Sequence, residues 1–369
     1  MTRKRTERAT IANVAKAAGV STATAGRVLG GYGYSSEEIR NRVQDAAKTL
    51  GYRPNRLARG LITGQTQTIG VVAADIGSPY YASAMRGIAD VARTAGFGAI
   101  ITNSDENLQL EREAVELLLE KQVDGIIVSP ADPENSAHLQ AAIEAGCPVV
   151  QLDRIAYPLQ ADSVTVDNRG AAKDAVARLL RSGHTRIAVV GELETSPFGD
   201  LAEFIDTAGR VRLDPQTLYP SWQRLLGYLE AHWEAQVPVL PGLIGRVGKY
   251  SAESARSCVR QLMLADAPPS AIFASDGVMA TGTVQALRDQ EARIPQDVSL
   301  VCFDDLEWMQ FFGPGITAVA QPVRELGSMA ASLLLERIGG DTSPRRHTVL
   351  SAQLVERGSI SERLGVPTD

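Results

Sequence analysis

Residues 10–29, TIANVAKAAGVSTATAGRVL, decide the fold of the first part of this chain. Apolar Ile11 and Val14 lie one helical turn apart, and Thr10 stands where a side-chain oxygen can cap the helix that they begin. Gly19 predicts a tight turn, because glycine adopts a positive φ without steric cost. The stretch therefore predicts two short helices joined by a glycine turn, the pattern of a helix-turn-helix.

The second of these helices is predicted over residues 22–29, with Ser21 as its cap and Ala25, Val28 and Leu29 facing inward. Its outward face combines small polar side chains with one arginine, which suits the DNA major groove. The predicted DNA-binding residues of the head, its two caps included, are Thr10, Ser21, Thr22, Ala23, Thr24 and Arg27. The alternative is a small helical hairpin with no nucleic-acid role.

The following residues favour DNA binding. A third helix is predicted over residues 35–50, with Ser35 and Glu38 as a capping box, and it completes a minimal core. Residues 1–60 contain 12 Lys and Arg against four Asp and Glu, a net charge of +8. The whole chain carries −6, so the remainder carries −14. A basic head on an acidic body indicates a phosphate-binding module joined to a part of another kind.

The composition excludes several classes of protein. No stretch approaches the roughly 20 apolar residues of a membrane span, and the charged start MTRKRTERAT does not resemble a signal peptide. We therefore expect a cytoplasmic protein without a membrane partner. The three widely spaced cysteines, Cys147, Cys258 and Cys302, predict buried free thiols. The four histidines show no metal-ligand spacing, so no metal or cofactor is predicted.

From Thr68 onward, apolar strands alternate with amphipathic helices, which predicts α/β architecture with doubly wound parallel sheets. The pattern occurs twice, so we expect two lobes. The predicted domains are a helix-turn-helix head over 1–52, a linker over 53–66, a first lobe over 67–164 with 304–340, and a second lobe over 165–303 with 345–360.

Enzyme motifs are missing. No GxGxxG follows the first predicted strand, and no GxSxG occurs. The segment nearest to a P-loop, residues 245–250, has the wrong spacing and ends in Tyr250 where Ser or Thr should bind a metal. We therefore predict that the chain is not an enzyme.

Together these motifs resemble the LacI/GalR family of transcriptional regulators. The matching residues are Thr10-Ile11, Val14-Ala15, Ala18-Gly19-Val20-Ser21, Thr24, Arg27-Val28-Leu29 and Gly51-Tyr52-Arg53-Pro54-Asn55. One departure is Gly26, where the family usually has Ser; it costs roughly 1 kcal/mol of helix propensity relative to Ala. The resemblance implies a repressor that binds a pseudo-palindromic operator in double-stranded DNA as a homodimer. It also implies a periplasmic-binding-protein-like core that holds a small polar effector, a sugar or sugar derivative, between its lobes.

The resemblance further implies that the linker forms a hinge helix on operator DNA. By position, Asn55, Ala58 and Arg59 would face DNA, and Leu61 would enter the minor groove. The alternative is a solvated tether, because a helix of about seven residues is not stable alone.

The predicted effector site lies at the carboxyl ends of the strands, where open α/β sheets bind ligands. Ser129 and Asp153 follow two predicted strands and can bond hydroxyls, and the resemblance contributes most of the others. The predicted residues are Tyr80, Tyr81, Ser129, Asp153, Trp222, Arg224, Lys249, Tyr250 and Asp276. The alternatives are that one tyrosine ring only packs its lobe, and that Asp276 caps the following helix.

An insertion near residues 195–221 distinguishes this chain from the family. The family's Arg-x-x-Gly-aromatic motif matches residues 224–228, which begin 33 residues after Gly191 instead of about ten. The insertion is predicted either to cover the cleft as a lid or to extend the surface without touching ligand. Arg224 and Lys249 favour an effector that carries a carboxylate or phosphate.

The competing interpretation is a ligand-binding protein of the periplasmic sugar-binding type with no role in gene regulation. The basic head and the missing signal peptide argue against it.

Overall fold

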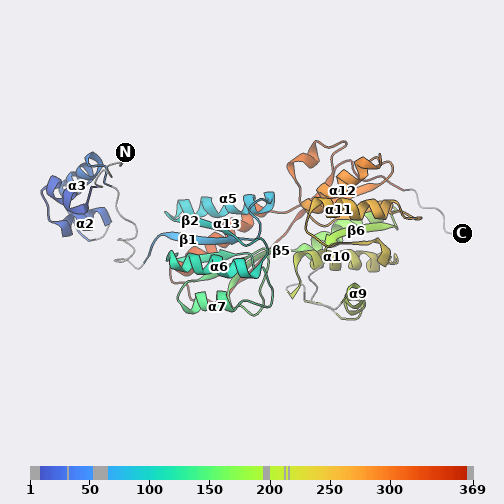
Figure 1. Ribbon diagram of the computed structural model, residues 1–369, viewed down its shortest axis with the longest axis horizontal. Helices are drawn as coiled ribbons and strands as arrows, with labels where there is room; N and C mark the ends of the chain where they lie inside the picture. The colour runs from blue at the N-terminus through green and yellow to red at the C-terminus, as the bar shows by residue number, and fades with distance from the viewer. Residues whose placement is uncertain are drawn as a thin grey trace, which may run out of the picture. The chain divides into compact units, whose positions relative to one another are not determined.

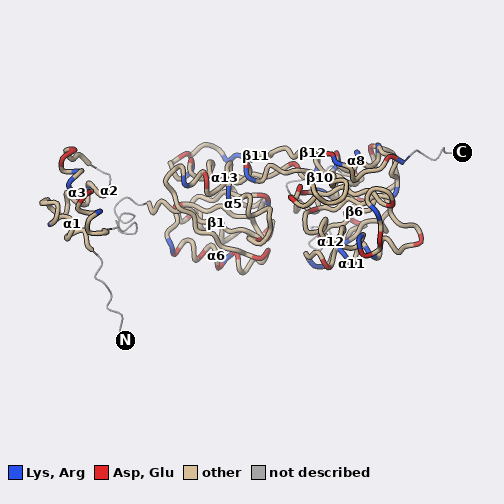
Figure 2. Tube along the Cα trace, turned by 90° about the horizontal axis from the view of Figure 1, so that it is seen from above, with Lys and Arg blue, Asp and Glu red and all other residues tan. Residues whose placement is uncertain are grey.

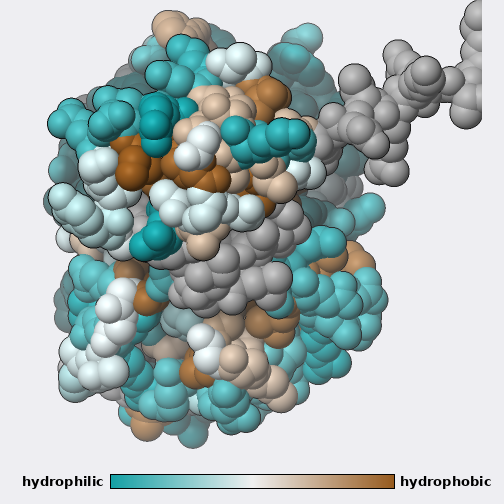
Figure 3. Space-filling view, turned by 90° about the vertical axis from the view of Figure 1, so that its left-hand side faces the viewer, coloured by the Kyte–Doolittle hydropathy of each residue, from teal (hydrophilic) through white to brown (hydrophobic). Residues whose placement is uncertain are grey.

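The computed structural model describes residues 9–30, 33–52, 65–193, 200–211, 213–214 and 217–363 (Figure 1). It divides into two compact units. One contains residues up to Thr68 together with Gln122–Asp124, and the other contains the rest of the chain. Among the described residues, no helix is both long and apolar enough to cross a membrane. On the face drawn in Figure 3, hydrophobic residues form small groups among hydrophilic ones.

The head consists of α1 (Ile11–Ala18), α2 (Thr22–Gly30) and α3 (Glu37–Thr49). Thr10 and Asn13 cap α1 reciprocally, and Gly19 ends it with φ +67°, as the turn requires. The third helix begins two residues later than predicted, and its predicted cap is wrong by one residue. Ser36, not Ser35, is its cap, because the Ser36 hydroxyl accepts from the Ile39 amide at 3.4 Å.

The first lobe is a six-stranded sheet in the order β11-β5-β4-β3-β1-β2. Its strands are β1 (Thr68–Ala73), β2 (Gly98–Asn103), β3 (Gly125–Val128), β4 (Val149–Leu152), β5 (Asp162–Val166) and β11 (His347–Leu350). Its helices are α5 (Pro79–Thr94), α6 (Leu108–Glu120), α7 (Ala137–Glu144) and α13 (Val323–Ile338). Figures 1 and 2 show α5 and α13 on one side of β1 and α6 on the other.

The second lobe repeats this plan in the order β12-β10-β9-β8-β6-β7, except that its edge strand β12 pairs antiparallel with β10, unlike the predicted parallel sheet. Its strands are β6 (Ile187–Glu192), β7 (Ile244–Val247), β8 (Ala271–Ala274), β9 (Ser299–Phe303), β10 (Thr317–Ala320) and β12 (Gln353–Val355). Its helices are α8 (Asn168–Arg181), α9 (Leu201–Arg210), α10 (Pro220–Glu234), α11 (Ala252–Met263) and α12 (Gly277–Asp289). Helices α11 and α12 cover one face of the sheet, and α8 and α10 cover the other (Figures 1 and 2).

The lobes exchange chain segments at points that differ from the prediction. The predicted first lobe included 304–340, but β10 pairs in parallel with β9 and so belongs to the second lobe. The predicted second lobe included 345–360, but β11 pairs in parallel with β5 in the first. The chain therefore crosses between lobes after β5, after β10 and after β11.

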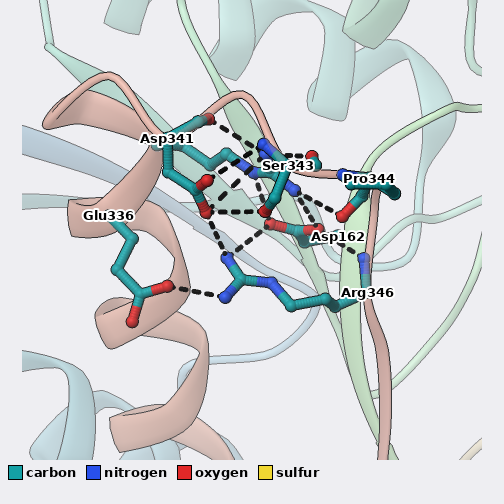
Figure 4. Close-up of polar contacts among 7 residues, drawn as sticks. Asp162, Glu336, Asp341, Ser343, Pro344 and Arg346 are labelled. Carbon is teal, nitrogen blue, oxygen red and sulfur yellow. Dashed lines mark hydrogen bonds and ion pairs between the residues drawn. The ribbon is translucent and has the colours of Figure 1, made fainter.

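A buried carboxylate ties three elements of the first lobe together. Asp162, at the start of β5, accepts from Arg337 Nε at 2.8 Å and Nη2 at 2.9 Å, and from the Arg346 amide at 2.7 Å. Arg346 also pairs with Glu336 at 2.6 Å and with Asp341 at 3.1 Å (Figure 4). Burial alone raises the pKa of Asp162, but the hydrogen bonds from Arg337 and the Arg346 amide lower it below its ordinary value.

We expect Asp162→Asn to lower the free energy of unfolding by about 3 kcal/mol, because it removes the buried carboxylate that accepts two hydrogen bonds from Arg337 and leaves only Asp341, at 3.8 Å, as an ionised partner. The matched control is Asp206→Asn, which removes an exposed pair with Arg210 at 2.7 Å and should cost less than about 0.5 kcal/mol. Denaturant unfolding of the purified variants measures both values, and equal losses would contradict the assignment.

The same carboxylate should make stability depend on pH. Because the folded state lowers the pKa of Asp162, its contribution is complete above pH about 4 and is lost as the pH falls through the lowered value.

Candidate functional site

The exposed face of α2 carries the predicted base-reading residues. Ala25 is fully buried in the core of the head, whereas Thr22, Ala23 and Arg27 are exposed. Ser21 caps the helix, since its hydroxyl accepts from the Thr24 amide at 3.1 Å. Gly26 does not interrupt the helix, which continues to Gly30. The predicted hinge contacts at Asn55, Ala58, Arg59 and Leu61 lie outside the described residues.

The second candidate site is a cavity of about 1280 Å³ between the two lobes. Its walls come from the carboxyl ends of strands in both sheets and from the helices that follow them. Six of the predicted effector residues line it: Tyr80, Tyr81, Asp153, Arg224, Tyr250 and Asp276.

On the first lobe, the Asp153 carboxylate accepts hydrogen bonds from two tyrosines. The Tyr80 hydroxyl donates to Oδ1 of Asp153 at 2.8 Å, and the Tyr81 hydroxyl donates to Oδ2 at 3.2 Å. Burial and the adjacent carboxylate raise the pKa of both phenols, so both keep their protons. Since the Tyr81 proton goes to the carboxylate, Ser129 donates to the Tyr81 oxygen, at 2.8 Å.

On the second lobe, Arg224 is held by neutral partners. Its Nε donates to Asn168 Oδ1 at 2.8 Å and its Nη1 to the Ser275 carbonyl at 2.7 Å, and its guanidinium lies 3.8 Å from the centroid of the Phe303 ring. Gly227, one turn later, lets α10 pack closely on α8, because a Cβ there would lie 2.3 Å from the Arg169 carbonyl oxygen.

Asp276 both caps α12 and lines the cavity. Its Oδ1 accepts from the amides of Val278 at 2.8 Å and Met279 at 2.9 Å. Asp304, from the end of β9, accepts from the Gly277 amide at 3.0 Å. Burial, reinforced by the charge of Asp304 and opposed by these amides and Arg224, raises the pKa of Asp276 to about 6.

Asp153 and Asp304 occupy corresponding places in the two lobes. Each follows the third strand in the order of its sheet, β4 and β9, and each has a left-handed backbone, with φ of +70° and +68°. Aspartate tolerates this conformation better than most residues do, and such conformations cluster at functional sites. Two equivalent carboxylates thus line the cavity.

Three predicted effector residues do not line the cavity. Ser129 is buried behind Tyr81. Trp222 is fully buried in the core of the second lobe, where its ring packs edge-on against Phe204 with centroids 4.8 Å apart. Lys249 is exposed and lies outside the lining. The predictions for Trp222 and Lys249 rest on their nearness in sequence to a motif. Such nearness does not show which way a side chain points.

The cavity also contains residues that the sequence analysis did not assign to it. Asp304 directly follows β9, and its correspondence to Asp153 is the signal that could have found it. Tyr219 and Arg154 line the cavity as well. No sequence pattern identifies them, because their contact joins different lobes. In the described part of the chain, no group of His, Cys, Asp and Glu is arranged to hold a metal ion.

Three family models match the chain. The model for bacterial regulatory proteins of the lacI family matches residues 10–55. The model for periplasmic binding proteins and the sugar binding domain of the LacI family matches residues 66–200, and one for a periplasmic binding protein-like domain matches residues 176–360.

Curated relatives match over nearly the whole length. Catabolite control protein A of Priestia megaterium is 34% identical over 90% of this chain and 93% of its own. The HTH-type transcriptional regulator PtxS of Pseudomonas plecoglossicida is 33% identical over 96% of this chain and 97% of its own.

Solved structures agree. A transcriptional regulator CelR–cellobiose complex is 27% identical, with a TM-score of 0.67, over 95% of this chain and 100% of that one. The Lac repressor dimer bound to operator and the anti-inducer ONPF has a TM-score of 0.80 at 24% identity. The match covers 96% of this chain and 100% of that one, and it shows the same fold. The chain therefore belongs to the LacI family of bacterial regulatory proteins and is a DNA-binding transcriptional regulator.

Proposed function

We propose that this regulator is a repressor that binds a pseudo-palindromic operator as a homodimer and is controlled by an uncharged sugar or sugar derivative. The effector binds in the cavity between the lobes. The observation that carries this proposal is the lining of that cavity, which combines tyrosine rings with the carboxylates of Asp153, Asp276 and Asp304.

The exposed face of α2 supports the DNA side of the proposal. In our proposal Arg27 bonds a guanine and Ala23 contacts a thymine methyl group; both side chains are exposed on α2. One such helix reads only a few base pairs, so two heads related by a two-fold axis read a pseudo-palindrome.

The charge of the lining supports an uncharged effector. Among the residues that the structure describes, nine Asp and Glu line the cavity against three arginines. Arg154 pairs with Glu106 at 2.6 Å and Arg324 with Asp90 at 2.5 Å, which leaves Arg224 among neutral partners. Carboxylates accept hydrogen bonds from hydroxyls and repel anions. The anionic effector expected from Arg224 and Lys249 is therefore not proposed, since Lys249 lies outside the lining.

Two regulators with similar folds have been solved with a bound sugar. Solved structures with similar folds include the CelR–cellobiose complex and a LacI family regulator from Enterococcus faecium with bound ribose. In our proposal the effector changes the closure of the lobes and thereby the spacing of the two DNA-binding heads. A coupling free energy on the order of 1–3 kcal/mol is sufficient.

The first test is selection of genome fragments by the purified protein, followed by footprinting over a salt series. We expect a protected pseudo-palindrome whose affinity falls steeply as salt rises, because phosphate contacts release counterions. Failure to enrich any fragment, with and without candidate effectors, would contradict the proposal.

Arg27→Ala should relax the base preference at one position of each half-site and weaken specific binding by about 1–3 kcal/mol. The matched control is Arg42→Ala, which removes an exposed arginine from α3 and should leave the base preference unchanged. Selection from randomised duplexes with each variant measures the preference. An Arg27→Ala protein with the wild-type preference would count against the assignment.

A thermal-shift screen with neutral sugars and their matching sugar acids tests the cavity. We expect the neutral member of each pair to stabilise the protein more. Asp276→Asn should then weaken the best neutral ligand by roughly tenfold or more, because it removes a charged acceptor while asparagine still caps α12. Asp167→Asn is the control, since Asp167 caps α8 in the same way outside the lining.

The wild-type affinity should also fall as the pH drops through the raised pKa of Asp276, about 6. The loss should be roughly tenfold by pH 5, where about a tenth of this carboxyl remains ionised. Calorimetric titrations at pH 7 and pH 5 measure it. A wild-type loss that Asp276→Asn reproduces in full would assign the titration to another group.

A further inference from the structure

Tyr219 lies at the end of the insertion and is anchored to the second lobe. It is the residue before α10, and its ring lines the cavity. Helix α9, earlier in the insertion, buries Phe204 against Trp222 of α10. The described part of the insertion therefore packs on the second lobe at both of its ends, and Tyr219 moves with that lobe.

The Tyr219 ring packs against the core of the second lobe, but its hydrogen bond and its cation–π contact are both on the first lobe. Its hydroxyl donates to the carbonyl oxygen of Ala131 at 2.7 Å, in the loop after β3. Its ring faces the guanidinium of Arg154, which follows β4, at 5.6 Å from the ring centroid. The side chain thus joins the two walls of the cavity.

The first lobe holds both of these partners in place. The Ala131 amide donates to Oε2 of the buried Glu111 at 2.6 Å, and Oε1 of Glu111 bonds His138 Nε2 at 2.7 Å. Arg154 is fixed by Glu106 at 2.6 Å. Because both partners are held before Tyr219 arrives, little side-chain freedom is lost when the contact forms.

We propose that Tyr219 is a positioning residue that stabilises the closed arrangement of the lobes, and that the insertion serves to present it. Opening the cleft separates the Tyr219 hydroxyl from Ala131 and its ring from Arg154 together. An effector therefore binds a cleft that is already biased toward closure. This inference rests on the proposed function of the cleft as the effector site.

The test compares Tyr219→Phe with Tyr157→Phe in the full chain, without DNA or effector. Tyr157→Phe is a matched control, because its hydroxyl bonds Glu134 at 2.6 Å within the first lobe and lies outside the cavity lining. Spin labels at Glu120→Cys and Arg260→Cys, both exposed and one on each lobe, report the distance between lobes in a Cys258→Ser background. Cys147 and Cys302 are buried.

We expect a wild-type distance distribution dominated by the closed arrangement. Tyr219→Phe should raise the ratio of open to closed molecules by about two- to tenfold, the range for one hydrogen bond between neutral groups. It should also weaken the best ligand of the thermal-shift screen, and Tyr157→Phe should do neither. Because phenylalanine keeps the ring, the variant should fold, and thermal unfolding checks this.

The proposal is overturned if Tyr219→Phe gives the wild-type distribution, if Tyr157→Phe shifts it equally, or if the wild-type protein is wholly open without effector. These distances are measured without DNA, so failure here is distinct from failure of the proposed function, which the fragment selection reports.

Discussion

Parallel neighbours in a sheet cannot be joined by a tight turn, so crossover helices connect the successive strands from β1 to β4 in the first lobe and from β6 to β9 in the second. This constraint collects the carboxyl ends of the strands at one edge of each sheet, and the cavity lies between those edges. Both sheets have the same strand order, so β4 and β9 end at equivalent points. Asp153 and Asp304 therefore line the cavity from opposite lobes, each in a left-handed conformation.

Carboxylates in such a cavity need partners, and backbone and phenol groups supply them. Asp153 accepts from Tyr80 and Tyr81, and Asp276 accepts from two amides at the start of α12. The positive end of the α12 dipole also stabilises negative charge. Asp304 lies at the same helix end, where it accepts a hydrogen bond from the Gly277 amide. These bonds orient acceptor oxygens before any ligand arrives, and preorganised acceptors suit a ligand with several hydroxyls.

The predictions for the cavity rest on different kinds of sequence signal, and these differ in how well they succeed. Asp153 directly follows β4, and the rule that ligands bind at strand ends placed it correctly, whereas Tyr80, Tyr81 and Asp276 came from the resemblance. Trp222 was chosen because it stands near Arg224 in the sequence. Two residues along a helix turn the side chain by about 200°, so Arg224 reaches the cavity while Trp222 packs into the core.

The sequence by itself determined the local structure. The cap at Thr10, the turn at Gly19 and the alternation of apolar strands with amphipathic helices specify the head and the α/β class, because these signals act over a few residues. Only the tertiary structure decided that β10 and β11 pair in different lobes from those predicted, and that Tyr219 contacts Ala131 across the cleft. Strand pairing and cross-lobe contacts join residues far apart in the chain, and they depend on how whole lobes pack rather than on any short pattern.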